Sequence, residues 1–225
     1  MVAGAPTVSN EGFLRPLERP VIAWLVARIP ERASPDTLTC IGVVGTLMTF
    51  VGYAAAGLRP AFLWLASFGL IVNWFGDSLD GALARYRQIE RSRYGFYLDH
   101  SLDTVALFLI AIGIGLSGYV RWDVCFFTLS TYYMLAVLSL IRTNVSDIFQ
   151  ISYMAIGPTE VRFGFVVLNT AMLIYPPASA DWMSYPNVAA LLWAALMLGN
   201  FAVSMIKQIR QLAKEEPPRR RPQTF

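Results

Sequence analysis

The chain has 225 residues, of which 56% are hydrophobic and only 15% are charged, and its mean hydropathy is +0.49. This composition excludes an ordinary soluble domain and indicates an integral membrane protein. The net charge of +3 does not indicate a nucleic-acid partner, because the basic residues flank apolar runs instead of gathering on a recognition element.

Two segments precede the first long apolar run. Residues 1–12 are expected to be disordered. In residues 13–33, five apolar side chains share one helical sector: Leu14, Leu17, Val21, Leu25 and Ile29. This pattern predicts an amphipathic helix lying on the membrane surface with Trp24 at headgroup depth, although Glu18 and Arg28 interrupt the apolar sector.

Six apolar runs then follow, near residues 34–56, 60–87, 95–118, 124–141, 161–175 and 188–206. Runs of about 20 residues match a hydrocarbon core about 30 Å thick. The sequence therefore predicts an all-α integral membrane protein. Its domain at residues 34–208 would hold six transmembrane helices, preceded by the N-terminal interfacial helix and followed by a basic cytoplasmic tail at 209–225.

Charge placement predicts the orientation in the membrane. Six spans put both termini on one side, and of the 18 Lys and Arg residues only Arg59 and Arg121 fall on the other. Because Lys and Arg are enriched in cytoplasmic loops, both termini are expected in the cytoplasm. The basic stretch 207–221 is expected to lie against anionic membrane lipids.

Four aspartates border or lie within the second and third of these runs. Asp77 and Asp80 are three positions apart and Asp99 and Asp103 are four apart, so on helices each pair shares one face. Carboxylates in or near hydrocarbon are costly unless something neutralises them. Four hard oxygen donors without a cysteine suit two Mg²⁺ or Mn²⁺ ions, near the cytoplasmic face. An intramembrane carrier of divalent cations is an alternative interpretation.

The spacing around these aspartates resembles the signature of the CDP-alcohol phosphotransferase family, D-x2-D-G-x2-A-R-x8/9-G-x3-D-x3-D. Its fixed positions are filled by Asp77, Asp80, Gly81, Ala84, Arg85, Gly95, Asp99 and Asp103. The resemblance implies a phospholipid-synthesis enzyme that transfers a substituted phosphate from a CDP-linked donor, favouring CDP-diacylglycerol, to an alcohol hydroxyl and releases CMP. It also implies that the four aspartates hold two divalent metal ions. Dimers are common in the family, so a homodimer is a further expectation.

The resemblance implies donor-binding roles for four more residues. Gly81 and Ala84 would keep the helix surface low for the nucleotide, with close helix packing as the alternative. Arg85 would reach a donor phosphate. Thr39, in a segment resembling the opening of the family's first span, would hold the nucleotide or phosphate, unless it only bonds its own helix backbone.

Two interpretations remain for the general base. Asp103 is the residue usually proposed for bacterial members. His100 and Glu160 instead resemble a His and Glu pair of the choline/ethanolamine phosphotransferase branch, in which Glu160 would orient His100. That second resemblance keeps open the transfer of a CDP-linked head group to diacylglycerol.

Three polar residues outside the signature are weaker candidates. Asn73 lies one turn before Asp77 and is a candidate to orient that carboxylate, or else a helix-packing amide. Arg142 and Arg162 bracket a polar segment and would either bind an anionic acceptor or act as ordinary positive-inside anchors.

Overall fold

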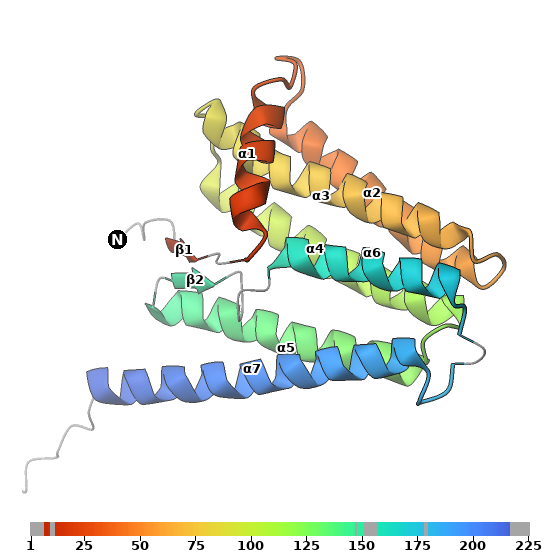
Figure 1. Ribbon diagram of the computed structural model, residues 1–225. Helices are drawn as coiled ribbons and strands as arrows, with labels where there is room; N and C mark the ends of the chain where they lie inside the picture. Colours follow the sequence, from red (N-terminus) through yellow and green to blue (C-terminus); the bar gives the residue numbers. More distant parts are fainter. Residues whose placement is uncertain (1–6, 10–11, 147, 151–156, 178–179, 217–225) are drawn as a thin grey trace, which may run out of the picture.

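The computed structural model describes residues 7–9, 12–146, 148–150, 157–177 and 180–216. Within these ranges it is almost entirely helical (Figure 1). The helices are α1 Arg15–Val26, α2 Pro35–Ala56, α3 Phe62–Tyr86, α4 Ser92–Ser117, α5 Trp122–Ser146, α6 Pro158–Ile174 and α7 Tyr185–Glu215. Two three-residue strands, β1 Thr7–Ser9 and β2 Ile148–Gln150, pair in parallel.

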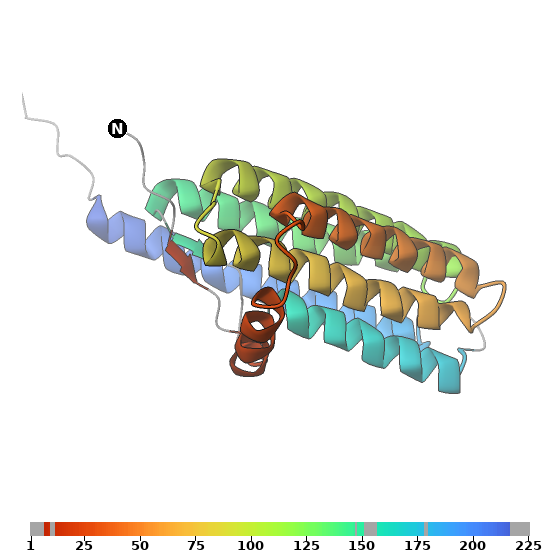
Figure 2. The same cartoon turned by 90° about the horizontal axis from the view of Figure 1, so that it is seen from above.

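Helices α2 to α7 run side by side in one bundle, and α1 lies crosswise to them near one end (Figures 1 and 2). Five helices are long and apolar enough to cross a membrane: α2, α3, α4, α5 and α7. The 17-residue α6 is shorter than these five. The prediction of an all-helical membrane bundle is therefore confirmed, with five spanning candidates among the described residues.

Glycines bring α2 and α3 into backbone contact. A Cβ atom placed on Gly76 would overlap the backbone nitrogen of Gly42, and one on Gly45 would overlap the backbone nitrogen of Asn73. Since no side chain separates the two helices at these points, their polar groups meet directly. This close approach brings Thr39 of α2 to Asp80 of α3.

Helix α1 has two apolar faces instead of the single sector that the sequence predicted. Its inward face packs into a core cluster with α2 and α3, made of Ile22, Leu25, Val26, Ile29, Leu38, Ile41, Phe75, Leu79, Ala82 and Leu83. Leu17 and Val21, expected in the same sector as Leu25 and Ile29, are instead exposed by 71% and 47%. The two groups separate because Leu17 and Val21 lie about 100° around the helix from the inward stripe.

Two helices extend well past their predicted ends. Helix α5 begins at Trp122 and extends to Ser146, beyond the predicted 124–141. Helix α7 continues to Glu215, so the first part of the predicted tail is helical, and an intrahelical hydrogen bond from Gln211 to Glu215 supports that extension. Residues 217–225 of the tail lie outside the described residues, as does most of the segment 1–12 that we expected to be disordered. Within the segment 1–12, residues 7–9 form β1 and are therefore ordered, in contrast to the prediction.

Candidate metal and substrate site

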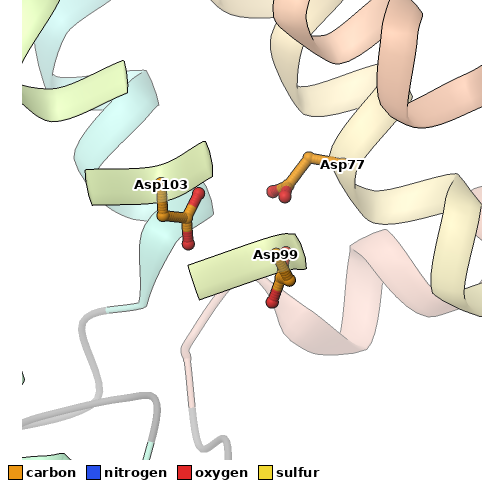
Figure 3. A group of neighbouring side chains, drawn as sticks. All are labelled: Asp77, Asp99 and Asp103. Atoms are coloured by element: carbon orange, nitrogen blue, oxygen red, sulfur yellow. The ribbon is translucent and has the colours of Figure 1, made fainter. Parts of the chain in front are cut away.

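Three of the four predicted aspartates converge between two helices. Asp77 comes from α3, and Asp99 and Asp103 come from successive turns of α4 (Figure 3). One carboxylate oxygen from each lies within 4.8 Å of the others. Hard carboxylate oxygens at this separation are suited to a shared Mg²⁺ or Mn²⁺ ion.

Asp80, the fourth predicted aspartate, lines the same cavity as the other three. Its Oδ2 accepts a hydrogen bond from Thr39 Oγ1 at 2.7 Å, and its Oδ1 accepts one from the Gly81 backbone N–H at 2.5 Å. Asp80 is thus oriented by a neighbouring helix and by its own backbone. Asp80 is not part of the cluster of three, and its role as a fourth metal ligand stays a prediction.

Thr39 contacts an aspartate of the cavity, which the sequence did not predict. The expectation was contact with a nucleotide or phosphate, or a bond to its own helix. The structure places its hydroxyl 2.7 Å from Asp80 Oδ2 and also 3.2 Å from the Pro35 carbonyl oxygen. Thr39 lines the cavity as well, so its direct contact with substrate stays a prediction.

Arg162 contacts the aspartate cluster, which the sequence did not predict. Its side chain reaches from α6 to α3, where one Nη donates to Asp77 Oδ2 at 2.6 Å and Nε donates to Asn73 Oδ1 at 2.9 Å. The Asn73 amide in turn donates to the Gly42 carbonyl oxygen and lies 3.1 Å from Thr46 Oγ1. Asn73 therefore joins α3 to α2 and contacts the guanidinium that binds Asp77, and its role in orienting that carboxylate stays a prediction.

One feature of the sequence indicated that Arg162 has an acidic partner. Arg162 stands in the first turns of an apolar helix, where an arginine without an acidic partner would be costly. Its side chain is only 15% exposed, which an anchor in the headgroup region would not need. Arg142, the other arginine considered for an anionic acceptor, instead lines a cavity between α5 and α7, which shares no lining residue with the aspartate cavity.

His100 and Glu160 have partners other than each other. His100 stacks on Phe96 with ring centroids 4.2 Å apart, and its Nδ1 lies 2.9 Å from the Phe96 carbonyl oxygen and 3.5 Å from Asp99 Oδ2. Glu160 accepts from the backbone N–H of Leu14 at 2.7 Å with one oxygen and from that of Gly157 at 2.8 Å with the other. The orientation of His100 by Glu160 stays a prediction.

The first glycine of the signature, Gly81, lies beneath an arginine. A Cβ atom on Gly81 would come within 3.3 Å of a terminal nitrogen of Arg85, so the guanidinium folds back over the glycine. Arg85 is exposed, and Ala84 is partly buried one position before it. An exposed guanidinium above a helix surface that has no side chain at Gly81 is suited to bind an anionic group such as a phosphate.

The carboxylates around the cavity carry more negative charge than the protein's own cations neutralise there. Four carboxylates surround the cavity, and one guanidinium, that of Arg162, contacts one of them. The remaining negative charge, placed among membrane-spanning helices, favours divalent cations. Such ions would bring a phosphate substrate to the cavity.

A family model described as CDP-alcohol phosphatidyltransferase matches residues 32–205, which is most of the chain. The chain belongs to the CDP-alcohol phosphatidyltransferase family. The family assignment makes it a multi-pass membrane enzyme of phospholipid synthesis that transfers a substituted phosphate group from a CDP-linked donor to an alcohol hydroxyl and releases CMP. The family assignment favours the enzyme over the alternative of a divalent-cation carrier. The family depends on metal, and the aspartate cluster supplies a suitable set of ligands.

Several curated proteins are similar to this chain. The archaetidylinositol phosphate synthase of Pyrococcus horikoshii is 37% identical over 161 residues, covering 66% of this chain and 83% of that protein. The cholinephosphotransferase 1 of Danio rerio is 33% identical over 109 residues, but the match takes in 44% of this chain and only 28% of that longer protein.

A solved structure shares the fold of this phosphatidyltransferase family member. The phosphatidylinositol phosphate synthase of Mycobacterium tuberculosis, solved with CDP-DAG bound, superposes with a TM-score of 0.53 over 86% of this chain and 92% of that one, at 17% sequence identity. At this identity the likeness shows the common helical arrangement alone.

Proposed function

We propose that this enzyme uses a CDP-linked lipid of the CDP-diacylglycerol type as donor and a phosphorylated polyol as acceptor. The observation that carries the proposal is the aspartate cavity together with a buried arginine, Arg162, which binds one of its aspartates, Asp77. Two carboxylate-bound cations would take the donor diphosphate, and the guanidinium beside Asp77 would attract an acceptor that is itself anionic.

The similar proteins support both halves of this proposal. The Pyrococcus horikoshii relative is an archaetidylinositol phosphate synthase, and the Mycobacterium tuberculosis structure contains CDP-DAG. Transfer of a choline-type head group to diacylglycerol is less favoured, because the cholinephosphotransferase matches take in only 28–33% of the length of those proteins.

In the proposed reaction the acceptor hydroxyl oxygen attacks the β-phosphorus of the donor. The bond between that phosphorus and the oxygen bridging to CMP breaks, and CMP leaves with the electron pair. Asp77, Asp80, Asp99 and Asp103 would hold two Mg²⁺ or Mn²⁺ ions, whose chemistry is to neutralise the diphosphate oxygens. Arg85 would bind a donor phosphate, over the surface left low by Gly81 and Ala84.

We propose Asp103 as the group that accepts the hydroxyl proton. It is one of the three clustered carboxylates and therefore adjacent to where the attacking oxygen must arrive. His100 is the alternative base. Its Nδ1 faces the Phe96 carbonyl oxygen, which only accepts hydrogen bonds, so in the neutral ring Nδ1 carries the proton and Nε2 is the basic nitrogen.

For the arrangement in the membrane, we propose six spans with α6 as the shortest, and α1 on the cytoplasmic surface. Three observations support the surface position of α1. It lies crosswise to the bundle (Figure 1), Leu17 and Trp24 of α1 and Phe13 just before it are more than half exposed, and Arg28 stacks over the Trp24 ring at 4.1 Å. Both termini and the aspartate cavity would then face the cytoplasm. A homodimer stays a prediction.

A substrate panel tests the proposed function. Purified protein in bilayer discs is given CDP-diacylglycerol and Mg²⁺ or Mn²⁺, with inositol phosphate, glycerol phosphate, inositol or serine as acceptor, and CMP release is measured. CDP-choline with diacylglycerol is assayed in parallel. We expect metal-dependent CMP release with a phosphorylated polyol and little with its unphosphorylated form. CMP release with CDP-choline and diacylglycerol alone would refute the proposal.

A further inference from the structure

Glu18 is a charged residue on the packed face of α1. Ile22, Leu25 and Ile29 follow it at helical spacing, and all three pack against the cluster shared with α2 and α3. A carboxylate on such a face is expected to have compensating hydrogen bonds. This inward position explains why Glu18 interrupts the apolar pattern of a helix that is otherwise suited to a membrane surface.

One oxygen of Glu18 gathers donors from two other helices. Its Oε1 accepts from the indole N–H of Trp74 at 2.6 Å and from the hydroxyl of Thr159 at 2.8 Å, and the hydroxyl of Ser78 lies 3.5 Å away. Trp74 and Ser78 belong to α3, and Thr159 belongs to the first turn of α6. The carboxylate therefore joins α1, α3 and the start of α6 at a single point.

These donors are neighbours of the site residues. Trp74 directly follows Asn73 and Ser78 directly follows Asp77, while Thr159 lies three residues before Arg162. Arg162 makes another connection between the same two helices, since it bonds Asp77 and Asn73. Near the aspartates, helices α3 and α6 are thus tied through Glu18 and through Arg162, about one helical turn apart, and farther along them the Asn169 amide donates to the Ser67 hydroxyl.

We propose that Glu18 is a positioning residue for the catalytic centre. By fastening the first turn of α6 to α3, it keeps the Arg162 guanidinium on Asp77, and thereby couples the surface helix α1 to the aspartate cavity. This inference rests on the metal centre proposed above. An incoming cation competes with the guanidinium for Asp77, so any change that loosens α6 alters the affinity of the cavity for metal.

The test is a double-mutant cycle with Mn²⁺ binding as the readout. Mn²⁺ is titrated into full-length protein in bilayer discs without nucleotide and free Mn²⁺ is followed by electron paramagnetic resonance. Arg162→Gln removes a positive charge beside Asp77, so we expect its Mn²⁺ dissociation constant to fall about tenfold. Glu18→Ala is expected to lower it about threefold, and to add nothing in the Arg162→Gln background.

Two more variants protect the test against misfolding. Thr159→Val removes one donor and leaves Glu18 bonded to Trp74, and is expected to change Mn²⁺ affinity in the same direction as Glu18→Ala. Arg19→Ala, at an exposed neighbouring charge of α1, serves as the matched control with wild-type affinity. Amide hydrogen exchange in residues 157–162 is expected to rise in Glu18→Ala and Thr159→Val but not in Arg19→Ala.

Two results would overturn the positioning role. One is an unchanged Mn²⁺ affinity in Glu18→Ala, and the other is an effect of Glu18→Ala that adds fully to that of Arg162→Gln. A purely structural contact of Glu18 would give one of these two results. Failure of the wild type to bind Mn²⁺ would refute the metal centre instead. In that case hydrogen exchange decides about Glu18, and wild-type exchange at 157–162 in both variants would overturn the inference.

Discussion

Replacing Asp99 by asparagine should stabilise the metal-free protein while removing its response to metal. The carboxylate oxygens of Asp77, Asp99 and Asp103 lie within 4.8 Å of one another, so Asp99 takes part in two close repulsions. At 4.8 Å, each pair repels by roughly 3.5 kcal/mol at an effective dielectric constant of about 20, and by roughly 0.9 kcal/mol in water.

Because Asp99 is partly exposed to solvent, we expect the gain in stability on its replacement to lie near the lower value. The Asp99 side chain is 46% exposed, so water screens its interactions strongly. Two pairs at the lower value give a gain of about 2 kcal/mol for Asp99→Asn, which corresponds to a rise in melting temperature of about 4–8 °C for a chain of this size. The wild type, with Mn²⁺ at about 100 times its dissociation constant, should gain about 2.7 kcal/mol per site, and Asp99→Asn should gain none.

Thermal unfolding of detergent-purified protein at low ionic strength measures both effects, first with EDTA and then with Mn²⁺. Asp123→Asn is the matched control, because it makes the same chemical change at a carboxylate paired with Arg121 instead of other acids. The control should not be stabilised with EDTA and should keep the full Mn²⁺ shift. A lower melting temperature for Asp99→Asn with EDTA, together with a normal Mn²⁺ shift, would refute the idea of mutually repelling metal ligands.

Three further changes have definite expected outcomes. Thr39→Val should lower kcat/KM about tenfold by releasing the Asp80 carboxylate, and Thr39→Ser, which keeps the hydroxyl, should restore it; equal activity of both variants would contradict this role. Gly76→Ala should lower the free energy of unfolding, measured by denaturation, by about 1–3 kcal/mol or more, because a Cβ would meet the α2 backbone. In the same assay Gly164→Ala should be neutral or slightly stabilising, because a Cβ there meets nothing within 4 Å. His100→Ala should keep kcat within about threefold of the wild type in the CMP-release assay, and a loss of about 100-fold or more would identify the histidine as the base.

The α1 helix shows where sequence patterns stop being informative. Helical periodicity in residues 13–33 predicted an amphipathic helix, and the structure forms a helix there at Arg15–Val26, but the pattern assigned Leu17 and Leu25 to one face. The structure exposes Leu17 and packs Leu25 into the core. Periodicity reports which side chains share a sector of one helix, and it carries no information on whether lipid or another helix covers that sector.

The sequence by itself determined the membrane class, the positions of the long apolar helices and the spacing that puts Asp99 and Asp103 on one face of α4. These features follow from composition and from the 3.6-residue period, which are local properties of the chain. The tertiary structure alone decided that Asp80 turns to Thr39 and that Arg162 reaches Asp77, a residue 85 positions away. Such pairings depend on which helices pack together and how closely their glycines let them approach, and no local pattern encodes that.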